Sequence, residues 1–219
     1  MQEADLNSRD ISCVLFDMDG TLVDTIGLIL RSFHATFESL GLPDRPDPEL
    51  LALIGKPLWY QMPLFDPERV DELCATYQSF YERFHDESAA AYPGIEEMLA
   101  GLEAQGHLLG VVTSKRQVTA RPGLAHFGLD RYFKVIITAN DTERHKPEPE
   151  PVLAALAALG CEAAHAAYVG DSTYDVDCGN AAGVFSVAVL WGPFERELLA
   201  QHQPGAFAET PADLLRLFP

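Results

Sequence analysis

The chain has 219 residues, of which 47% are hydrophobic and 22% are charged, and its formal net charge is −18. The composition is that of an ordinary globular protein, and the length suits one domain, with or without an insertion. The acidic balance argues against nucleic acid or an anionic membrane as a partner, whereas a local lysine or metal ion would still allow a small phosphorylated ligand.

We expect neither a secretory signal nor a membrane-spanning segment. Residues 1–10 hold no apolar segment typical of a secretory signal, and no apolar run reaches the ~18 residues that cross a bilayer. The four cysteines are scattered and form no C-x-x-C pair, so we expect reduced thiols. We therefore expect a cytoplasmic protein with a flexible N-terminus over residues 1–10.

Five short apolar segments are typical of buried strands. They are "SCVLF" from Ser12, "LLGVVT" from Leu108, "KVIIT" from Lys134, "AAYVG" from Ala166 and "SVAVL" from Ser186. Helical patterns lie between them, such as "PEPVLAALAALG", which begins with prolines and closes on a glycine. Strands that alternate with helices predict an α/β fold with a Rossmann-like parallel sheet and helices on both of its faces.

One segment, residues 23–90, departs from this alternation. It contains two amphipathic helical patterns, one from Ile29 to Leu40 and one from Val70 to Phe84, and no convincing strand. We expect it to form an α-helical cap domain inserted after the first strand, while residues 11–22 and 91–219 form the catalytic core. Two aromatic residues of this segment, Trp59 and Phe65, are expected to pack in the core of the cap.

Polar residues follow four of the predicted strands. They are Asp17, Asp19, Thr113, Ser114, Lys146, Asp171 and Asp175. Ligands of an open parallel sheet bind beyond the carboxyl ends of its strands, so we expect these residues to form one site. Two carboxylates 4 Å apart repel each other by roughly 4 kcal/mol at an effective dielectric of about 20, so the site needs positive charge.

A hard cation such as Mg²⁺ would supply that charge, because it prefers oxygen ligands and combines carboxylates with substrate phosphate. Lys146 would supply a second positive charge. In such a site one carboxylate could attack phosphorus and a second could exchange the proton of the leaving group. A hydroxyl group and an ammonium group could hold the phosphoryl oxygens as charge develops on them.

Four sequence motifs, "DMDGTLVDT", "VVTSKR", "HKPEPEP" and "VGDSTYD", occur in this order along the chain. Together they resemble the motifs of the haloacid dehalogenase-like superfamily, in particular its phosphatases with a helical cap inserted after the first strand. The resemblance implies that Asp17 is the nucleophile and Asp19 the general acid and base. It implies that Thr113 binds the transferring phosphoryl group and that Lys146 stabilises the phosphorylated aspartate.

The same resemblance implies a Mg²⁺ site. Asp171 would bind the ion together with Asp17 and the backbone carbonyl of Asp19, and Asp175 would support it closely or as a further ligand. The residues of these motifs that we expect to contact the substrate are Gly20, Thr21 and Ser114.

Several further residues border the predicted site. Lys56 of the cap and Arg116 are candidates for binding the distal end of the substrate, although either could be solvated. Arg45 is expected to be solvated, and His145 to be a loop residue rather than a metal ligand, because Mg²⁺ prefers oxygen. Tyr174 lies between two acidic residues of the fourth motif and could border the site.

The narrower resemblance is to phosphoglycolate phosphatases and the related pyrophosphatase branch. It implies a Mg²⁺-dependent hydrolase of a small phosphorylated metabolite, a phosphomonoester similar to phosphoglycolate, that acts through an aspartyl-phosphate as a monomer or homodimer. A β-phosphoglucomutase-type phosphosugar mutase and an inorganic pyrophosphatase remain alternatives. A dehalogenase is disfavoured by Asp19, since that branch has no aspartate there, and a non-catalytic binding protein by the complete set of motifs.

Overall fold

The computed structural model describes residues 10–219. The predicted flexible N-terminus, residues 1–10, lies outside the described residues except for Asp10. None of the described helices is long and apolar enough to cross a membrane.

The core is built on one sheet of six strands, in which every neighbouring pair is parallel. The strand order is β5-β4-β1-β6-β7-β8. The strands are β1 (Cys13–Phe16), β4 (Leu108–Val112), β5 (Val135–Ile137), β6 (Ala166–Gly170), β7 (Phe185–Val189) and β8 (Ala206–Ala208). The predicted parallel sheet is therefore confirmed, and the sixth strand, β8, adds an edge that we did not predict.

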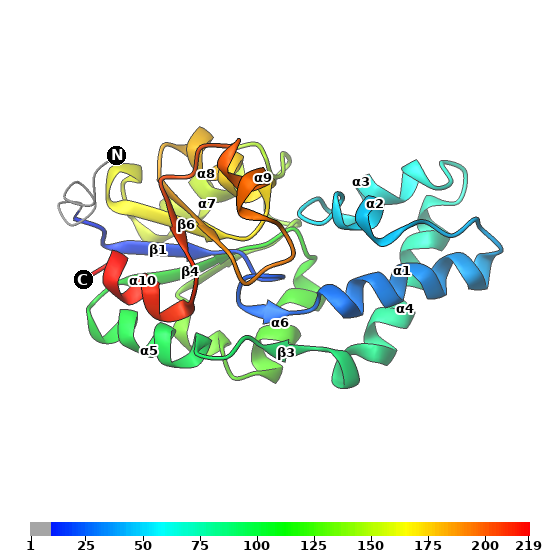
Figure 1. The fold of residues 1–219 in the computed structure, drawn as a ribbon, viewed down its shortest axis with the longest axis horizontal. Coiled ribbons are helices and arrows are strands. Elements are labelled where there is room, and N and C mark those ends of the chain that lie inside the picture. The colour runs from blue at the N-terminus through cyan, green and yellow to red at the C-terminus, as the bar shows by residue number, and fades with distance from the viewer. Residues whose placement is uncertain (1–9) are drawn as a thin grey trace.

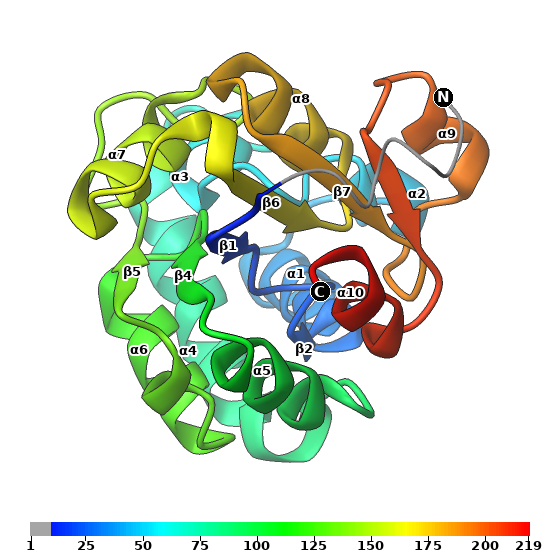
Figure 2. The same cartoon turned by 90° about the vertical axis from the view of Figure 1, so that its left-hand side faces the viewer.

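Helices cover both faces of this sheet, as predicted (Figure 2). Because side chains alternate along a strand, Val14 and Phe16 of β1 face one side and Cys13 and Leu15 the other. On the first side they pack with α5 (Ile95–Ala104), α6 (Gln117–His126) and α10 (Pro211–Leu217), and on the second with α7 (Glu150–Leu159) and α8 (Thr173–Ala182). Each of these four side chains is fully buried, and burial of a large apolar side chain contributes about 1.5–3 kcal/mol.

Shorter elements complete the core. A short helix, α9 (Arg196–Ala200), packs near the end of β7, where Leu199 meets Val176 and Ala188. Two 3-10 helices, η3 (Asp130–Tyr132) and η4 (Ala163–His165), lead into β5 and β6.

A second, helical layer lies beside the core and forms the right-hand part of Figure 1. It contains α1 (Ile26–Leu40), α2 (Asp47–Leu51), α3 (Leu58–Gln61), η2 (Met62–Leu64) and α4 (Val70–Ser88). These helices share a hydrophobic cluster of their own, in which the rings of Phe33 and Phe37 lie 5.8 Å and 4.8 Å from that of Phe65. The inserted helical cap of the predicted fold is thus present, and Phe65 packs in its core as expected.

Two very short strands join the cap to the core. They are β2 (Val23–Asp24) and β3 (Ala90–Ala91), and they pair with each other in antiparallel orientation. The sequence pattern contained no signal for them, because two residues are too few to show an alternation. They place the two crossings between core and cap side by side, next to the carboxyl end of β1.

Candidate active site

The candidate site lies at the carboxyl ends of three adjacent strands. β1 is paired with β4 on one side and β6 on the other. Asp17, Thr113 and Asp171 are the first residues beyond the ends of these strands, and all three are buried. The topology thus brings residues that are more than 150 positions apart in the sequence to one edge of the sheet.

Lys146 connects two of the carboxylates. Its ammonium Nζ lies 2.7 Å from Oδ1 of Asp17 and 2.6 Å from Oδ1 of Asp175. The lysine side chain is only 1% exposed, and a buried ammonium is tolerated only when it is paired. The two aspartates raise the pKa of Lys146, although its burial acts in the opposite direction. Lys146 therefore stays charged and fixes Asp17.

Asp175 is held by protein donors at both of its oxygens. Oδ1 accepts a hydrogen bond from the hydroxyl of Tyr168 (2.9 Å) as well as from Lys146. Oδ2 accepts from the backbone N–H (3.0 Å) and the hydroxyl (2.6 Å) of Ser172, which forms a capping box at the start of α8. With both oxygens occupied, Asp175 is placed to orient Lys146.

Asp171, unlike Asp175, has a hydrogen-bond donor at only one of its two oxygens within the part of the chain that the structure describes. Its Oδ1 accepts a hydrogen bond of 2.8 Å from the hydroxyl of Thr21, but its buried Oδ2 has no partner among the described residues. Oxygens of Asp17, Asp171 and Asp175 lie within 4.8 Å of one another. Burial, and then the charges of Asp175 and Asp17, raise the pKa of Asp171 well above its usual range. An unpartnered oxygen among carboxylates fits a hard divalent cation.

The carboxyl group of Asp17 also titrates abnormally. Burial, together with the charges of Asp175 and Asp19, raises its pKa from the ordinary 3.8 to about 7, despite the opposing effect of Lys146. A carboxylate that is this costly to ionise in the metal-free protein would be stabilised by a cation beside it.

Gly20 makes the close packing of the first motif possible. Its φ is +78°, in the left-handed region that favours glycine. A Cβ atom at this position would overlap with the carboxylate of Asp171. The glycine of the motif is therefore required by space as well as by backbone conformation.

Asp19 lies on the side of the site that faces the cap. Its Oδ1 accepts a short hydrogen bond from the hydroxyl of Thr25 and lies 3.0 Å from the ammonium of Lys115. Lys115 was not among the predicted site residues. Its spacing from Thr113 carried no signal, because the chain bends at Ser114 and Lys115 and the contact with Asp19 depends on how distant segments pack.

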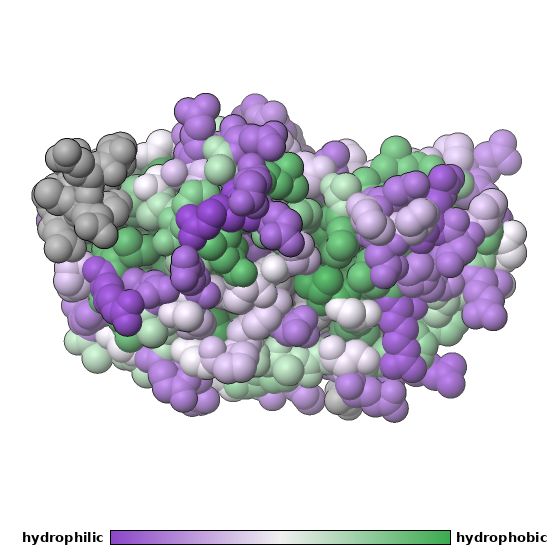
Figure 3. All heavy atoms as spheres, viewed as in Figure 1, coloured by the Kyte–Doolittle hydropathy of each residue, from purple (hydrophilic) through white to green (hydrophobic). Residues whose placement is uncertain are grey.

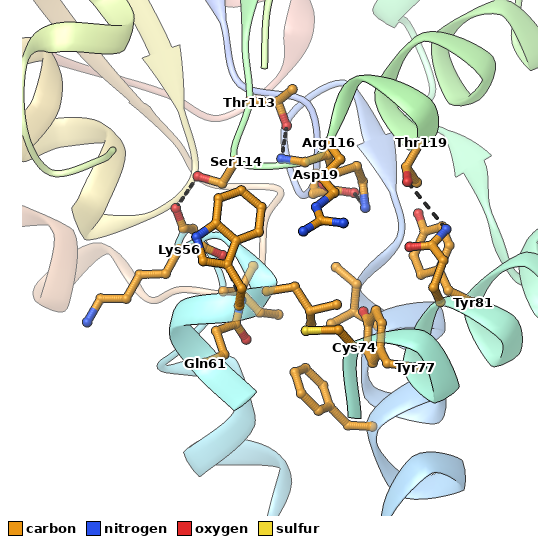
Figure 4. Close-up of a pocket in the computed structure, with 18 of the residues that line it drawn as sticks. Asp19, Lys56, Gln61, Cys74, Tyr77, Tyr81, Thr113, Ser114, Arg116 and Thr119 are labelled. Carbon is orange, nitrogen blue, oxygen red and sulfur yellow. Dashed lines mark hydrogen bonds and ion pairs between the residues drawn. The ribbon is translucent and has the colours of Figure 1, made fainter. Parts of the chain in front are cut away.

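A cavity of about 340 Å³ separates Asp17, Asp19 and Thr113 from the cap (Figure 4). On the face that Figure 3 displays, apolar surface lies between the core, on the left, and the cap, on the right. Apolar and aromatic side chains of the cap form most of the far wall of the cavity; among them are Ile29, Phe33, Leu58, Trp59, Tyr77 and Tyr81. Such a cavity can hold a group larger than a phosphate ion.

The two predicted distal residues are placed differently. The guanidinium of Arg116 extends into the cavity and lies 5.0 Å from the ring of Trp59 (Figure 4). The side chain of Lys56 instead points away from the other lining residues, and its ammonium lies 5.1 Å from the ring of Tyr174. Trp59, expected in the core of the cap, lines the cavity, because α3 faces the core domain.

Hydrogen bonds and ring contacts join the cap to the core beside this cavity. The hydroxyl of Ser114 donates a hydrogen bond to the backbone carbonyl of Gly55, and that of Tyr174 donates one of 3.1 Å to the carbonyl of Ala52. The ring of His145 lies 5.5 Å from that of Trp59, so this histidine packs against the cap. Ser114 and Tyr174 thus hold the cap loop. Arg45 lies on the surface of the cap, with Glu49 as its exposed ion-pair partner.

Comparison with known proteins agrees with this arrangement. Residues 14–189 match the family described as haloacid dehalogenase-like hydrolase. A protein of Caldanaerobacter subterraneus subsp. tengcongensis that carries the name PpaX is 41% identical over 208 residues, which cover 94% of each chain. Pyrophosphatase PpaX of Anoxybacillus flavithermus is 38% identical over 95% of this chain and 97% of its own.

A solved structure extends the comparison. A hydrolase of the haloacid dehalogenase-like family from Streptococcus pneumoniae has a TM-score of 0.85 and 25% identity, covering 96% of this chain and 99% of its own. By fold, by motif order and by sequence similarity, this chain belongs to the haloacid dehalogenase-like hydrolase family.

Proposed function

We propose that the chain is a Mg²⁺-dependent phosphatase that hydrolyses a small phosphorylated substrate through an aspartyl-phosphate on Asp17. The observation that carries the proposal is the pair of Asp17 and Asp171 at the ends of adjacent strands, with Lys146 bound to Asp17 and a buried, unpartnered oxygen on Asp171. Membership of the hydrolase family supports it.

Asp17 and Asp171 would hold the Mg²⁺ ion, with the backbone carbonyl of Asp19 as the further ligand that the family motif implies. When bound, Mg²⁺ supplies positive charge that offsets the carboxylates and the phosphoryl oxygens. Asp175 has no free oxygen for a metal, so its part is to hold Lys146 against Asp17.

In the first half of the reaction, an oxygen of Asp17 attacks phosphorus and the bond from phosphorus to the leaving-group oxygen breaks. Asp19 gives its proton to that oxygen, so the leaving group departs with a hydroxyl group in place of its bond to phosphorus. In the second half, Asp19 accepts a proton from the attacking water, whose oxygen bonds to phosphorus. The bond to Asp17 then breaks and phosphate is released.

The remaining groups bind and orient the transferring phosphoryl group. The ammonium of Lys146, 2.7 Å from Asp17, is placed to stabilise negative charge on the transferring group. The hydroxyl of Thr113 lies in the wall of the cavity beside Asp17 and would donate to a phosphoryl oxygen. The closed cap would keep bulk water away from the acyl-phosphate.

The substrate class we propose first is a small phosphomonoester with an anionic leaving group, such as phosphoglycolate. The largely apolar cavity and the guanidinium of Arg116 support an organic leaving group with a negative charge. Pyrophosphate is the second candidate, because a relative 38% identical to this chain carries the name pyrophosphatase. A phosphosugar mutase would require a bisphosphate activator and would yield an isomer rather than free phosphate.

The test is a panel of phosphorylated compounds assayed for phosphate release with Mg²⁺ and with EDTA. Phosphoglycolate, pyrophosphate, p-nitrophenyl phosphate and a hexose phosphate are compared by kcat/KM. We expect release that requires Mg²⁺ and is abolished in Asp17→Asn. Release of phosphate by Asp17→Asn at a normal rate would refute the mechanism. A higher kcat/KM for pyrophosphate than for any monoester would select the second candidate.

A further inference from the structure

Lys115 occupies a position that the family motifs do not explain. Its ammonium lies 3.0 Å from Oδ1 of Asp19 and 4.3 Å from the centre of the Tyr81 ring. The side chains of Lys115 and Asp19 are only 13% and 12% exposed. Tyr81 belongs to α4 of the cap, so Lys115 joins the loop after β4, the loop after β1 and the cap at one point.

We propose that Lys115 is a positioning residue that orients Asp19 for proton transfer, and that Tyr81 of the cap holds it in place. The proposal rests on the proposed function, in which Asp19 protonates the leaving group. Lys115 acts through Asp19 and takes no part in bond formation itself.

The hydrogen-bonding pattern of Asp19 carries this inference. Thr25 and Lys115 both lie at Oδ1, whereas Oδ2 has no partner among the described residues. Two donors at one oxygen restrict the rotation of the carboxyl group and leave the other oxygen for the leaving group. If Lys115 were removed, Thr25 would remain as a single hydrogen-bonding contact, about which the carboxyl group could turn.

The neighbouring cation has a different environment. Arg116 stacks near Trp59 and has no carboxylate partner among the described residues, so its charge is available to a ligand. The charge of Lys115 is already satisfied by Asp19 and by the face of the Tyr81 ring, at a distance typical of a cation–π contact. Arg116 therefore suits substrate binding, and Lys115 suits the positioning of Asp19.

The test compares two substrates of nearly equal size, phenyl phosphate and p-nitrophenyl phosphate, with Lys115→Met. The p-nitrophenolate leaves without a proton, whereas phenolate needs one, so only phenyl phosphate depends strongly on an oriented general acid. The ratio kcat/KM reports events up to departure of the leaving group. We expect it to fall by about 10-fold or more for phenyl phosphate and by less than about 3-fold for p-nitrophenyl phosphate, given the usual contribution of general acids.

Further variants separate the contributions. Lys115→Arg keeps the charge with altered geometry, so we expect it to restore part of the loss for phenyl phosphate. Tyr81→Leu removes both the ring and the hydroxyl that contact Lys115 and should show the pattern of Lys115→Met in weaker form, whereas Tyr81→Phe keeps the ring and should show a smaller effect than Tyr81→Leu. Lys134→Met, which removes an exposed lysine of the core paired with Glu103, is the matched control. It should leave kcat/KM unchanged for both phenyl phosphate and p-nitrophenyl phosphate.

An equal fall for both substrates in Lys115→Met and Lys115→Arg would show a structural role and overturn the proposal. A raised KM with unchanged kcat would show that Lys115 binds substrate and would overturn it too. Thermal unfolding of each variant verifies that it folds. If Lys115→Met does not fold, the comparison of the two substrates is made with Lys115→Arg instead. Failure of the proposed function is distinguishable, because the wild type would then release no phosphate from either substrate.

Discussion

Replacing the proposed nucleophile should stabilise the metal-free protein while abolishing its activity. Asp17→Asn keeps the shape of the side chain and an oxygen that can accept a hydrogen bond from Lys146, but it removes a negative charge from a buried site. The side chain of Asp17 is 8% exposed, so little solvent screens its carboxyl group. We therefore expect the variant to lose turnover and to gain stability in EDTA.

The size of the gain follows from the pKa. Burial raises the pKa of Asp17 from 3.8 to about 7, so the folded protein binds this proton more tightly than the unfolded chain. The free energy of unfolding of the wild type therefore falls as pH rises from about 3.8 to about 7 and is constant above that. Ionisation of Asp17 therefore lowers the free energy of unfolding of the wild type by about 4 kcal/mol at pH 7 and by about 1 kcal/mol at pH 4.5.

The measurement is urea unfolding of the wild type and Asp17→Asn in EDTA at pH 4.5 and pH 7. The variant should exceed the wild type by up to about 4 kcal/mol at pH 7 and by about 1 kcal/mol at pH 4.5. Added Mg²⁺ should stabilise the wild type and reduce the difference, because the ion binds the folded state. The reasoning would be refuted if the variant were less stable than the wild type, or if the difference in free energy of unfolding between the two were the same at both pH values.

Other residues of the site give further predictions. Lys146→Met leaves buried carboxylates without their counter-charge, so urea unfolding in EDTA should show a loss of about 3–5 kcal/mol, and an unchanged midpoint would contradict the proposed network. Asp171→Asn should abolish the rise in Tm that Mg²⁺ gives the wild type; a rise of equal size would exclude Asp171 as a ligand. Gly20→Ala should cost more than about 1 kcal/mol because of its positive φ and the overlap with Asp171. In Gly27→Ala, an open position of α1, stability should stay equal or rise by up to about 1 kcal/mol.

The sequence was sufficient to predict the sheet and the residues at its edge. Asp17 directly follows a fully buried strand, and Asp171 follows another, so the rule for parallel sheets places both at one edge. Because β1 pairs directly with β6, Asp17 and Asp171 lie close together whatever conformations their side chains adopt. The polar residues at strand ends were predictable for this reason.

Features that depend on the packing of the cap were not predictable in the same way. The direction of Lys56 and the exposure of Trp59 to the cavity are set by how α3 and its preceding loop meet the core. Lys115 was missed because the lysine gains its role only when Asp19 and Tyr81, far apart in the sequence, lie on either side of it. The strand β8 was missed because three residues are too few to show an alternation.

The most direct test of the central claim is to trap the phosphorylated enzyme. The wild type is mixed with a rapidly hydrolysed substrate and Mg²⁺, quenched in acid within one turnover and analysed by peptide mass spectrometry. We predict one phosphoryl group on the peptide that contains Asp17, labile to hydroxylamine as an acyl-phosphate is, and none in Asp17→Asn. A wild type that releases phosphate without phosphorylation of Asp17, or an Asp17→Asn variant that retains turnover, would contradict the account.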